Sequence, residues 1–333
     1  MATKKRITKR DILIGIVAGL LIASVLLFVF FFNPQRTFTI TETYRITSAY
    51  GEETFLRVML PISGAYQEIT DLQVEGAIYY EIDYFDGWRE LTARVPTSGD
   101  EVTVTISYTA RLLRNAGTWD GEVLPEYTLP QQFVDSDNES IIRLAAELRG
   151  DNELQTARSI FNHTSRTITT RTGTFMSEGY EPTQPYASEI LLNPVGVCYD
   201  YAILMTALLR AAGIPARMIS GLSLNIPLSR GGDWSHPGAA HAWVEFYADG
   251  AWHFADPTWG RRYFNRNGTA HLSLGTFEAY SRSDFQRNRL SKIEDDGFFI
   301  RGAMSTPISF VVFSSDENAT VVPRADVRFS WFR

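Results

Sequence analysis

Cysteine and histidine are scarce in this chain, which has one cysteine, Cys198, and five histidines among its 333 residues. A single thiol excludes an internal disulfide framework. It also disfavours a structural zinc site, because such sites gather several cysteines and histidines at short spacings. A lone cysteine is ordinarily a small buried apolar residue, so a chemical role for Cys198 has to be argued from its neighbours.

An excess of positive charge is also lacking, since the chain has a formal net charge of −7. Residues 1–36 carry six basic residues and one acidic residue, so the rest of the chain carries 25 basic and 37 acidic residues, a charge of −12. Nucleic-acid binding requires a basic surface. We therefore expect no nucleic-acid partner, and polyanionic wall polymers are disfavoured for the same reason.

One long hydrophobic run is present, Ile12–Phe32, with 21 residues and no charge. A helix of this length rises about 1.5 Å per residue and spans roughly the 30 Å of a bilayer core. A cleaved signal peptide would have a shorter apolar segment and a small-residue cleavage site, and neither is present. The positive-inside rule then predicts a single-pass membrane protein, with residues 1–36 as cytoplasmic N-terminus and transmembrane helix and the remainder extracytoplasmic. The basic residues that set this orientation are Lys4, Lys5, Arg6, Lys9 and Arg10.

Residues 37–114 have the pattern of a β-rich domain, with short alternating strands separated by turn residues. The regular strand spacing predicts a β-sandwich between the membrane and the rest of the chain, although an open barrel would have the same pattern. The expected strands are Thr39–Ile46, Thr54–Leu60, Ile78–Tyr84, Trp88–Val95 and Glu101–Tyr108.

A linker rich in Gly, Pro and Trp, residues 115–130, leads into residues 131–260, which we expect to form an α+β core. Capping residues and apolar stripes at helical spacing predict two helices there, one ending at Gly150 and one over Asn152–Ile168. Residues 261–333 are expected to be a C-terminal β-rich extension. This extension would either complete the sheet of the core or form a further β module.

Cys198 lies at the predicted N-terminus of a third helix. It follows Gly196-Val197 and precedes an apolar run of strong helix formers that ends at Gly213, a typical C-terminal cap. The free backbone N–H groups and the positive dipole end at such a position favour the thiolate, which is the form that attacks carbonyl carbon. The same N–H groups can bind the oxyanion that forms on attack. Cys198 is therefore predicted to be a nucleophile, and Gly196 either lets a substrate approach or is an ordinary turn glycine.

Residues 241–256 predict a β-hairpin that carries a base and the carboxylate that orients it. Alternating strands flank Asp249-Gly250, a typical tight-turn sequence. Pairing across that turn makes His241 and Asp256 diagonal neighbours on one face, within reach of a side-chain hydrogen bond. His253 falls on the opposite face, so we expect it to be structural.

Two alternatives use His236, which precedes Pro237-Gly238 in a predicted loop. It could replace His241 as the base. It could also join Cys198, His241 and Asp256 around a metal ion, but one cysteine without paired ligand spacings is not typical of a zinc site. We therefore expect no metal and no cofactor.

These residues stand in stretches that resemble the transglutaminase-like superfamily, the papain-related group of transglutaminases, bacterial envelope proteins and peptide N-glycanases. The resemblance covers roughly Gln131–Trp259 and implies a papain-like α+β core, in which a helix bearing Cys packs on an antiparallel sheet bearing His and Asp. It implies Cys198 as nucleophile, His241 as general acid/base and Asp256 as the residue that orients the imidazole. Residues 37–114 are similar, more weakly, to the β-domain that precedes this core in bacterial relatives. The matching stretches are Gly196–Ala202, Leu208–Arg217, His241–Glu245 and Trp252–Thr258.

The expected function is that of a membrane-anchored, extracytoplasmic cysteine acyl-transfer enzyme that acts on peptide amides through a thioester. Water would resolve the thioester in a peptidase or amidase, and an amine would do so in a transglutaminase. Two alternatives stay open: a catalytically silent scaffold that binds an envelope peptide or glycan, and removal of glycans from asparagine, which the anchor disfavours. The expected partners are a peptide or protein substrate in the cell envelope and the membrane itself.

Substrate contacts are expected from Tyr199, beside the nucleophile, and from Trp234 and Trp243, of which Trp243 shares the face of the predicted base. Helix packing and strand cores would also account for Tyr199 and Trp243. Two Gly-containing segments, Arg171–Pro185 and Leu222–Ala240, are expected to be either lids over the site or ordinary surface loops.

Overall fold

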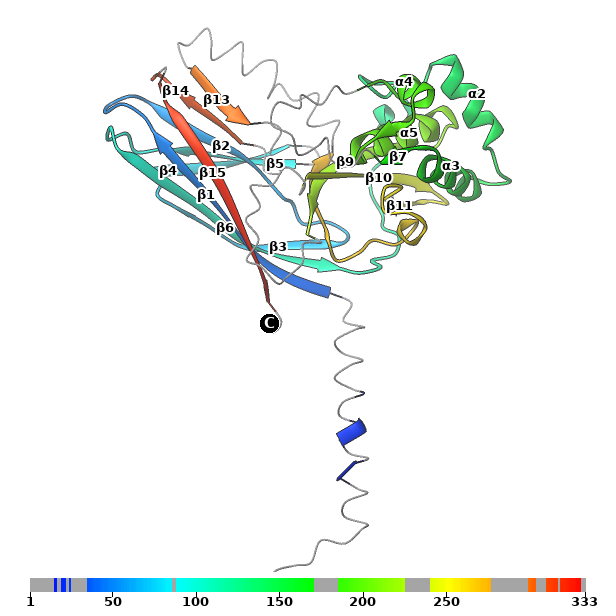
Figure 1. The fold of residues 1–333 in the computed structure, drawn as a ribbon, viewed down its shortest axis with the longest axis horizontal. Coiled ribbons are helices and arrows are strands. Elements are labelled where there is room, and N and C mark those ends of the chain that lie inside the picture. The colour runs from blue at the N-terminus through cyan, green and yellow to red at the C-terminus, as the bar shows by residue number, and fades with distance from the viewer. Residues whose placement is uncertain are drawn as a thin grey trace, which may run out of the picture.

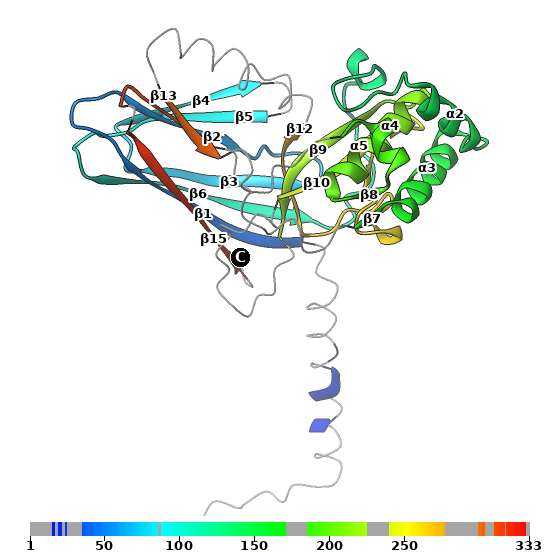
Figure 2. The same cartoon turned by 45° about the horizontal axis from the view of Figure 1, so that its top comes forward.

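The computed structural model describes most of the chain after residue 34 and six residues before it. The described residues are 15, 16, 19–21, 24, 35–85, 88–170, 185–224, 240–276, 299–303, 310–316 and 318–330. They form a long β-sandwich and, at one end of it, a smaller α+β unit that carries the helices, as Figures 1 and 2 show.

The membrane anchor predicted for residues 12–32 is described only in part. Among the described residues, no helix combines the length and the apolar character needed to cross a membrane. The run Ile12–Phe32 lies mostly outside the described residues. Within it, Gly15, Ile16, Gly19–Leu21 and Ser24 are helical.

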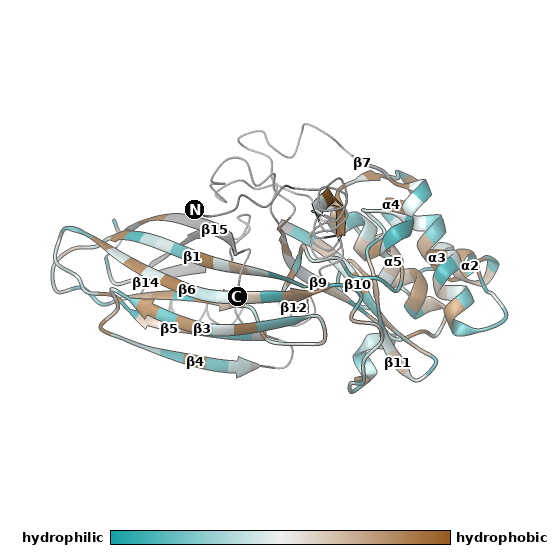
Figure 3. Ribbon diagram, turned by 90° about the horizontal axis from the view of Figure 1, so that it is seen from below, coloured by the Kyte–Doolittle hydropathy of each residue, from teal (hydrophilic) through white to brown (hydrophobic). Residues whose placement is uncertain are grey.

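The sandwich consists of two antiparallel sheets that share one hydrophobic core. Along the strands β1 and β6 buried residues alternate with more exposed ones, and Figure 3 shows hydrophobic and hydrophilic segments alternating along them. Inward side chains of both sheets, such as Ile40 and Tyr108 of the first and Val58 and Leu91 of the second, are at most 1% exposed. The first sheet has the order β15-β1-β6-β3, with β1 Gln35–Thr47, β3 Gln67–Glu75, β6 Glu101–Leu113 and β15 Thr320–Ser330. The second has the order β13-β14-β2-β5-β4, with β2 Thr54–Leu60, β4 Tyr79–Phe85, β5 Trp88–Arg94, β13 Phe299–Ala303 and β14 Phe310–Ser314.

The C-terminal part of the chain corrects the expected domain boundaries, because residues 261–333 are not one separate extension. Strand β15 pairs with β1 from Thr37↔Ser330 to Thr47↔Thr320, and β14 pairs with β2. Without these partners, β1 and β2 would be sheet edges with unpaired N–H and C=O groups. The β-rich domain predicted for residues 37–114 therefore requires strands from residues 299–330 to complete both of its sheets.

The α+β unit is built on a four-stranded antiparallel sheet with the order β11-β10-β9-β12. Helices cover one face of this sheet, where Ala242, Val244 and Phe246 share a hydrophobic core with α5. Since α5 lies between the sheet and the helices α2, α3 and α4, every residue from Ala202 to Leu209 is 0% exposed. The strands are β9 Ala216–Ser223, β10 Ala240–Ala248, β11 Ala251–Ala255 and β12 His271–Thr276. The helices are α2 Glu139–Glu147, α3 Glu153–Thr167, α4 Ala187–Leu192 and α5 Cys198–Ala211, with short elements at η1 Pro125–Thr128, β7 Thr169–Thr170, β8 Val195–Gly196 and η3 Arg261–Tyr263.

Strand β12 connects the two units. Its Leu272 and Leu274 belong to the hydrophobic core of the sandwich. The side-chain amide of Gln67 accepts a hydrogen bond from the backbone N–H of Ser273 at 2.7 Å and donates one to the carbonyl of the same residue at 2.8 Å. Residues 271–276 thus extend the sheet of the α+β unit, one of the two roles expected for the tail, and fasten it to the sandwich.

Candidate active site

Cys198 is the first residue of α5 and is 9% exposed. The turn before it is fixed by Asp200, whose Oδ2 accepts the backbone N–H of Val197 at 2.6 Å. A Cβ on Gly196 would overlap the Asp200 carboxylate. The helix start itself therefore requires glycine at this position, which supports the local role expected for Gly196.

Helix α5 is held against the sheet by a buried cation at its C-terminal end. The guanidinium of Arg210 donates to the carbonyl of Ala216 through Nε at 2.9 Å and Nη2 at 2.7 Å, and to the carbonyl of Leu129 through Nη1 at 2.9 Å. Gly213 follows with φ of 82°, the left-handed conformation typical of a helix C-terminus. These contacts set where the N-terminus of α5, and hence Cys198, lies relative to β9.

The hairpin β10–β11 carries His241 and Asp256. Its two-residue turn is Asp249-Gly250, with φ of 51° and 82°, as in the type I′ turns that match the twist of paired strands. The strands pair Ala248 with Ala251 and Val244 with Ala255. In this register the Nε2 of His241 lies 2.9 Å from Oδ2 of Asp256.

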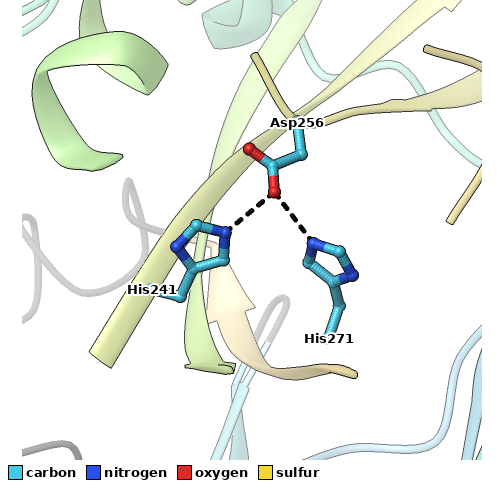
Figure 4. Close-up of side chains that lie close together, drawn as sticks. All are labelled: His241, Asp256 and His271. Atoms are coloured by element: carbon cyan, nitrogen blue, oxygen red, sulfur yellow. Dashed lines mark hydrogen bonds and ion pairs between the residues drawn. The ribbon is translucent and has the colours of Figure 1, made fainter. Parts of the chain in front are cut away.

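The Asp256 carboxylate is 0% exposed and has four hydrogen-bond donors among the described residues. Figure 4 shows Oδ2 between His241 and a second imidazole, that of His271, whose Nε2 lies 3.0 Å away. Oδ1 accepts the backbone N–H groups of Thr258 at 2.9 Å and Trp259 at 3.3 Å. A carboxylate so surrounded has one orientation.

The protonation states follow from burial and charge. The pKa of His241 is raised to about 10: burial lowers it, but the charge and hydrogen bond of Asp256, followed by those of Cys198, outweigh burial. Burial raises the pKa of Asp256, yet His241 and then His271 hold that pKa well below its usual range. The pKa of His271 is lowered, chiefly by burial. At neutral pH the site therefore holds an imidazolium at His241, a carboxylate at Asp256 and a neutral imidazole at His271.

The structure brings Cys198, His241 and Asp256 together in that order. Because Nε2 of His241 is bonded to Asp256, Nδ1 is the nitrogen left for the hydrogen bond with Cys198 that helps to raise the pKa of His241. This arrangement can hold a thiolate beside an imidazolium, which is a nucleophile next to a proton donor.

The structure describes two of the three predicted substrate-binding residues, Tyr199 and Trp243, and both pack against neighbouring side chains. Trp243 is 0% exposed and donates its Nε1–H to the hydroxyl of Tyr66 at 3.1 Å. It packs between sheet and sandwich, in agreement with the strand-core role that the sequence left open beside substrate contact. Tyr199 packs against the core of the α+β unit, and its hydroxyl lies 2.9 Å from Oγ of Ser220. Trp234 lies outside the described residues, as do His236 and most of the two expected lid segments.

His253 lies on the opposite face of the hairpin from the site. Its ring stacks on Phe246 with centroids 5.0 Å apart. Its nitrogens lie 2.9 Å from the carbonyl of Ala248 and 3.1 Å from Oδ1 of Asn265. The structural role expected for His253 agrees with these contacts.

His241, Asp256 and His271 also offer three possible metal-ligand atoms within 4.8 Å of one another. Two histidines and one carboxylate suit several transition metals. However, a ligating histidine ordinarily donates its second ring N–H to a partner, and Nδ1 of His271 has no hydrogen-bond partner in the described part of the chain. A metal would also have to displace the bonds from both imidazoles to Asp256, so the residues fit a hydrogen-bonded cluster better than a metal centre.

A cavity of about 280 Å³ lies where the sandwich meets the sheet of the α+β unit. Its lining includes Tyr66, Gln67, Trp119, Arg217 and Glu245, and none of the three expected catalytic residues. Arg217 and Glu245 bond to each other there, with Nη2 and Oε2 2.7 Å apart. The cavity is therefore a feature of the junction between the units.

The family model of the transglutaminase-like superfamily matches residues 142–257. These residues form a transglutaminase-like domain. The match includes Cys198, His241 and Asp256 and ends before β12, so His271 lies outside it.

Solved structures resemble the chain at low sequence identity. A candidate cysteine protease from Cytophaga hutchinsonii is 17% identical, with a TM-score of 0.52 over 89% of this chain and 98% of that one, which shows a shared fold. The periplasmic domain of TgpA from Pseudomonas aeruginosa, bound to ethylmercury, is 18% identical over 66% of this chain and 90% of that one, with a TM-score of 0.33. No curated protein matches the chain significantly.

His271 is the residue of this site that sequence reasoning missed. It lies in a segment that is polar and rich in turns, between the transglutaminase-like domain and the last strands. The one signal in the sequence was the alternation of His271 and Ser273 with Leu272 and Leu274, which is the period of a strand. Only the pairing of β12 with β9 brings this strand beside the hairpin.

Proposed function

We propose that the protein is a cysteine acyl-transfer enzyme in which Cys198 is the nucleophile. The observation that carries the proposal is the buried pair of His241 and Asp256, with the thiol of Cys198 on the remaining nitrogen of His241. A thiol that served only as packing would not need an imidazolium and a fixed carboxylate behind it.

The steps follow from this geometry. The Cys198 thiolate attacks an amide carbonyl carbon, and backbone N–H groups at the start of α5 stabilise the oxyanion. His241 gives the proton on Nδ1 to the leaving amine as the C–N bond breaks, which leaves a thioester on Cys198. Asp256 keeps the imidazole oriented throughout. Water or an amine then attacks the thioester and releases the acid or a new amide, while His241 takes up the proton of the attacking group.

The substrate and the location of the protein are also part of the proposal. A peptide or protein amide in the cell envelope is the substrate class that suits a transglutaminase-like domain held outside the cytoplasm by residues 12–32. The uncharged run and the basic residues before it support this location. Fractionation of cells that express the full chain, with protease added from outside, tests it: the chain should stay with the membranes and be cleaved in intact spheroplasts.

The pH dependence of Cys198 alkylation by iodoacetamide in the full chain tests the chemistry. Since Cys198 is the only cysteine, the label reports on one site. A free thiol reacts slowly below its ordinary pKa of about 8.5, so rapid alkylation at pH 6 that falls at least 10-fold in His241→Ala would support the proposal. A thiol that stays inert until the protein is denatured would contradict it and favour a binding scaffold.

Hydrolysis and transfer to an amine are distinguished on the same protein. Peptide amides are offered with and without an excess of a primary amine, and products are identified by mass. Release of the free acid in both cases identifies a peptidase or amidase, whereas formation of a new amide identifies a transglutaminase. Cys198→Ala is the control for both products.

A further inference from the structure

His271 is a buried imidazole that the steps above do not use. It is 0% exposed and lies at the start of β12, outside the residues that match the transglutaminase-like superfamily. Its Nε2 lies 3.0 Å from Oδ2 of Asp256. Because that oxygen belongs to an ionised carboxylate, Nε2 is the nitrogen that carries hydrogen and donates.

Aromatic rings enclose His271 on its other sides. The nearest is Trp259, with ring centroids 4.2 Å apart. Phe254, Trp243 and Tyr263 follow at 4.9, 5.1 and 5.5 Å. Nδ1 has no hydrogen-bond partner among the described residues. Among the described residues, the bond to Asp256 is thus the single hydrogen bond that the His271 side chain makes. The other ring nitrogen is buried without a partner, which costs free energy of folding. An apolar residue of similar size would not have this cost.

We propose that His271 is a positioning residue that fixes Asp256, and through it His241, by donating its Nε2–H to Oδ2. This inference rests on the proposed function. The two backbone N–H groups on Oδ1 define one side of the carboxylate, and His271 and His241 define the other. Without His271, Oδ2 would be held by His241 alone, the imidazole that has to keep Nδ1 directed at Cys198 during proton transfer.

Strand β12 makes this position rigid. Leu272 and Leu274 on the same strand lie in the core of the sandwich, and the backbone of Ser273 is bonded to Gln67. The sandwich therefore contributes to the site through the placement of His271. Among the described residues, the titratable groups in contact with the His271 ring are Asp256, His241 and Tyr263.

The test compares three variants by the pH dependence of Cys198 alkylation in the full chain. His271→Leu should lower the rate at pH 6 about 10-fold, the effect expected from loss of one hydrogen bond to a charged group, and should shift the pH at which alkylation becomes fast to a higher value. Asp256→Asn should do the same to a larger extent. His271→Gln, whose side-chain amide can place an N–H near the position of Nε2, should restore most of the wild-type profile.

A matched control separates positioning from simple stability. His253→Leu removes another buried histidine of the same sheet, on the opposite face, and should lower the melting temperature without moving the alkylation profile. A His271→Leu profile that coincides with wild type, while His241→Ala differs from wild type, would overturn the inference and leave the proposed function intact. An inert wild-type thiol would instead contradict the proposed function.

Nitrogen NMR of the wild-type imidazoles tests the same inference without any substitution. His271 should be neutral from pH 5 to 8, with its proton on Nε2. A proton on Nδ1, or a titration of His271 within this range, would overturn the proposal even if every His271 variant failed to fold.

Discussion

His241 and Trp259 stack face to face, with ring centroids 4.7 Å apart and 16° between the ring planes. The backbone N–H of Trp259 also donates to Oδ1 of Asp256 at 3.3 Å. One residue therefore contacts both members of the pair, the imidazole through its indole ring and the carboxylate through its backbone. Since an indole face attracts a cation, this stacking favours the protonated form of His241.

Replacing Trp259 by Ala should lower the pH at which His241 loses its proton. A cation–π contact of about 1 kcal/mol corresponds to a change of slightly less than one pH unit, and the backbone bond to Asp256 is kept. NMR titration of the His241 ring measures this midpoint. The midpoint in Trp259→Phe should lie between those of the wild type and Trp259→Ala. If the midpoint in Trp259→Ala equals that of the wild type, the ring contact contributes packing alone.

Gly196→Ala should impair the start of α5. The added Cβ overlaps the Asp200 carboxylate, so the bond from Val197 N–H to Oδ2 has to lengthen or break. We expect a loss of about 1–3 kcal/mol, typical of overpacking, and at least a 10-fold slower alkylation of Cys198. Urea unfolding and the alkylation rate at pH 7 measure the two effects.

A double-mutant cycle provides the control for that prediction. Asp200→Gly removes both the carboxylate and the Cβ of residue 200, so the same Gly196→Ala change should cost much less in the Asp200→Gly background. Equal costs in both backgrounds would mean that the Asp200 side chain is not what excludes a side chain at residue 196.

The hairpin could be predicted from the sequence because its signals are local. Asp249-Gly250 fixes a two-residue turn, and strand alternation then decides that His241 and Asp256 share a face while His253 does not. The start of α5 was readable for the same reason, from a run of helix formers between Cys198 and Gly213.

Three features could not be predicted from local signals, because they depend on pairing between distant segments. They are the place of His271 in the site, the domain boundaries and strand β3. β12 reaches the site only by pairing with β9, and β15 completes a sheet through β1, which lies some 280 positions earlier by the register Thr43↔Arg324. Strand β3 was missed because its residues are mostly exposed or half-buried and its pairing with β6 is interrupted by an irregularity after Thr70.

Tyr66→Phe should weaken the junction between sandwich and sheet. The Tyr66 hydroxyl donates to Oε1 of Glu245 at 2.7 Å and accepts the Nε1–H of Trp243. Its removal leaves two buried polar groups without that partner, and each such group costs about 1–3 kcal/mol. Urea unfolding should therefore show a loss of about 2 kcal/mol or more. Tyr247→Phe, on the same strand as Glu245, is the matched control and should change stability by less than about 0.5 kcal/mol.

Glu42 should make the sandwich less stable as the pH rises toward neutral. Its carboxyl is buried in the core and accepts hydrogen bonds from Tyr44 at 2.8 Å and Tyr108 at 2.9 Å. Burial raises its pKa from 4.5 to about 7, against the effect of these two bonds. Below pH 4.5 the group carries its proton in both the folded and the unfolded chain. Between pH 4.5 and 7 the unfolded chain has released a proton that the folded chain still holds, so the free energy of unfolding falls as the pH rises and the loss is complete above about pH 7.

Glu42→Gln should therefore be more stable than wild type at pH 8 and nearly equal to it at pH 4.5. The glutamine keeps an oxygen acceptor and cannot ionise, so the gain at pH 8 should be on the order of 3 kcal/mol. Urea unfolding at a series of pH values measures it. Glu68→Gln on β3, whose side chain is about half exposed and paired with Arg111, serves as the control for a Glu-to-Gln change outside the core. If the difference in free energy of unfolding between Glu42→Gln and wild type stays constant from pH 4.5 to 8, Glu42 does not titrate in this range. The hydrogen bonds from Tyr44 and Tyr108 would then keep its carboxylate ionised throughout.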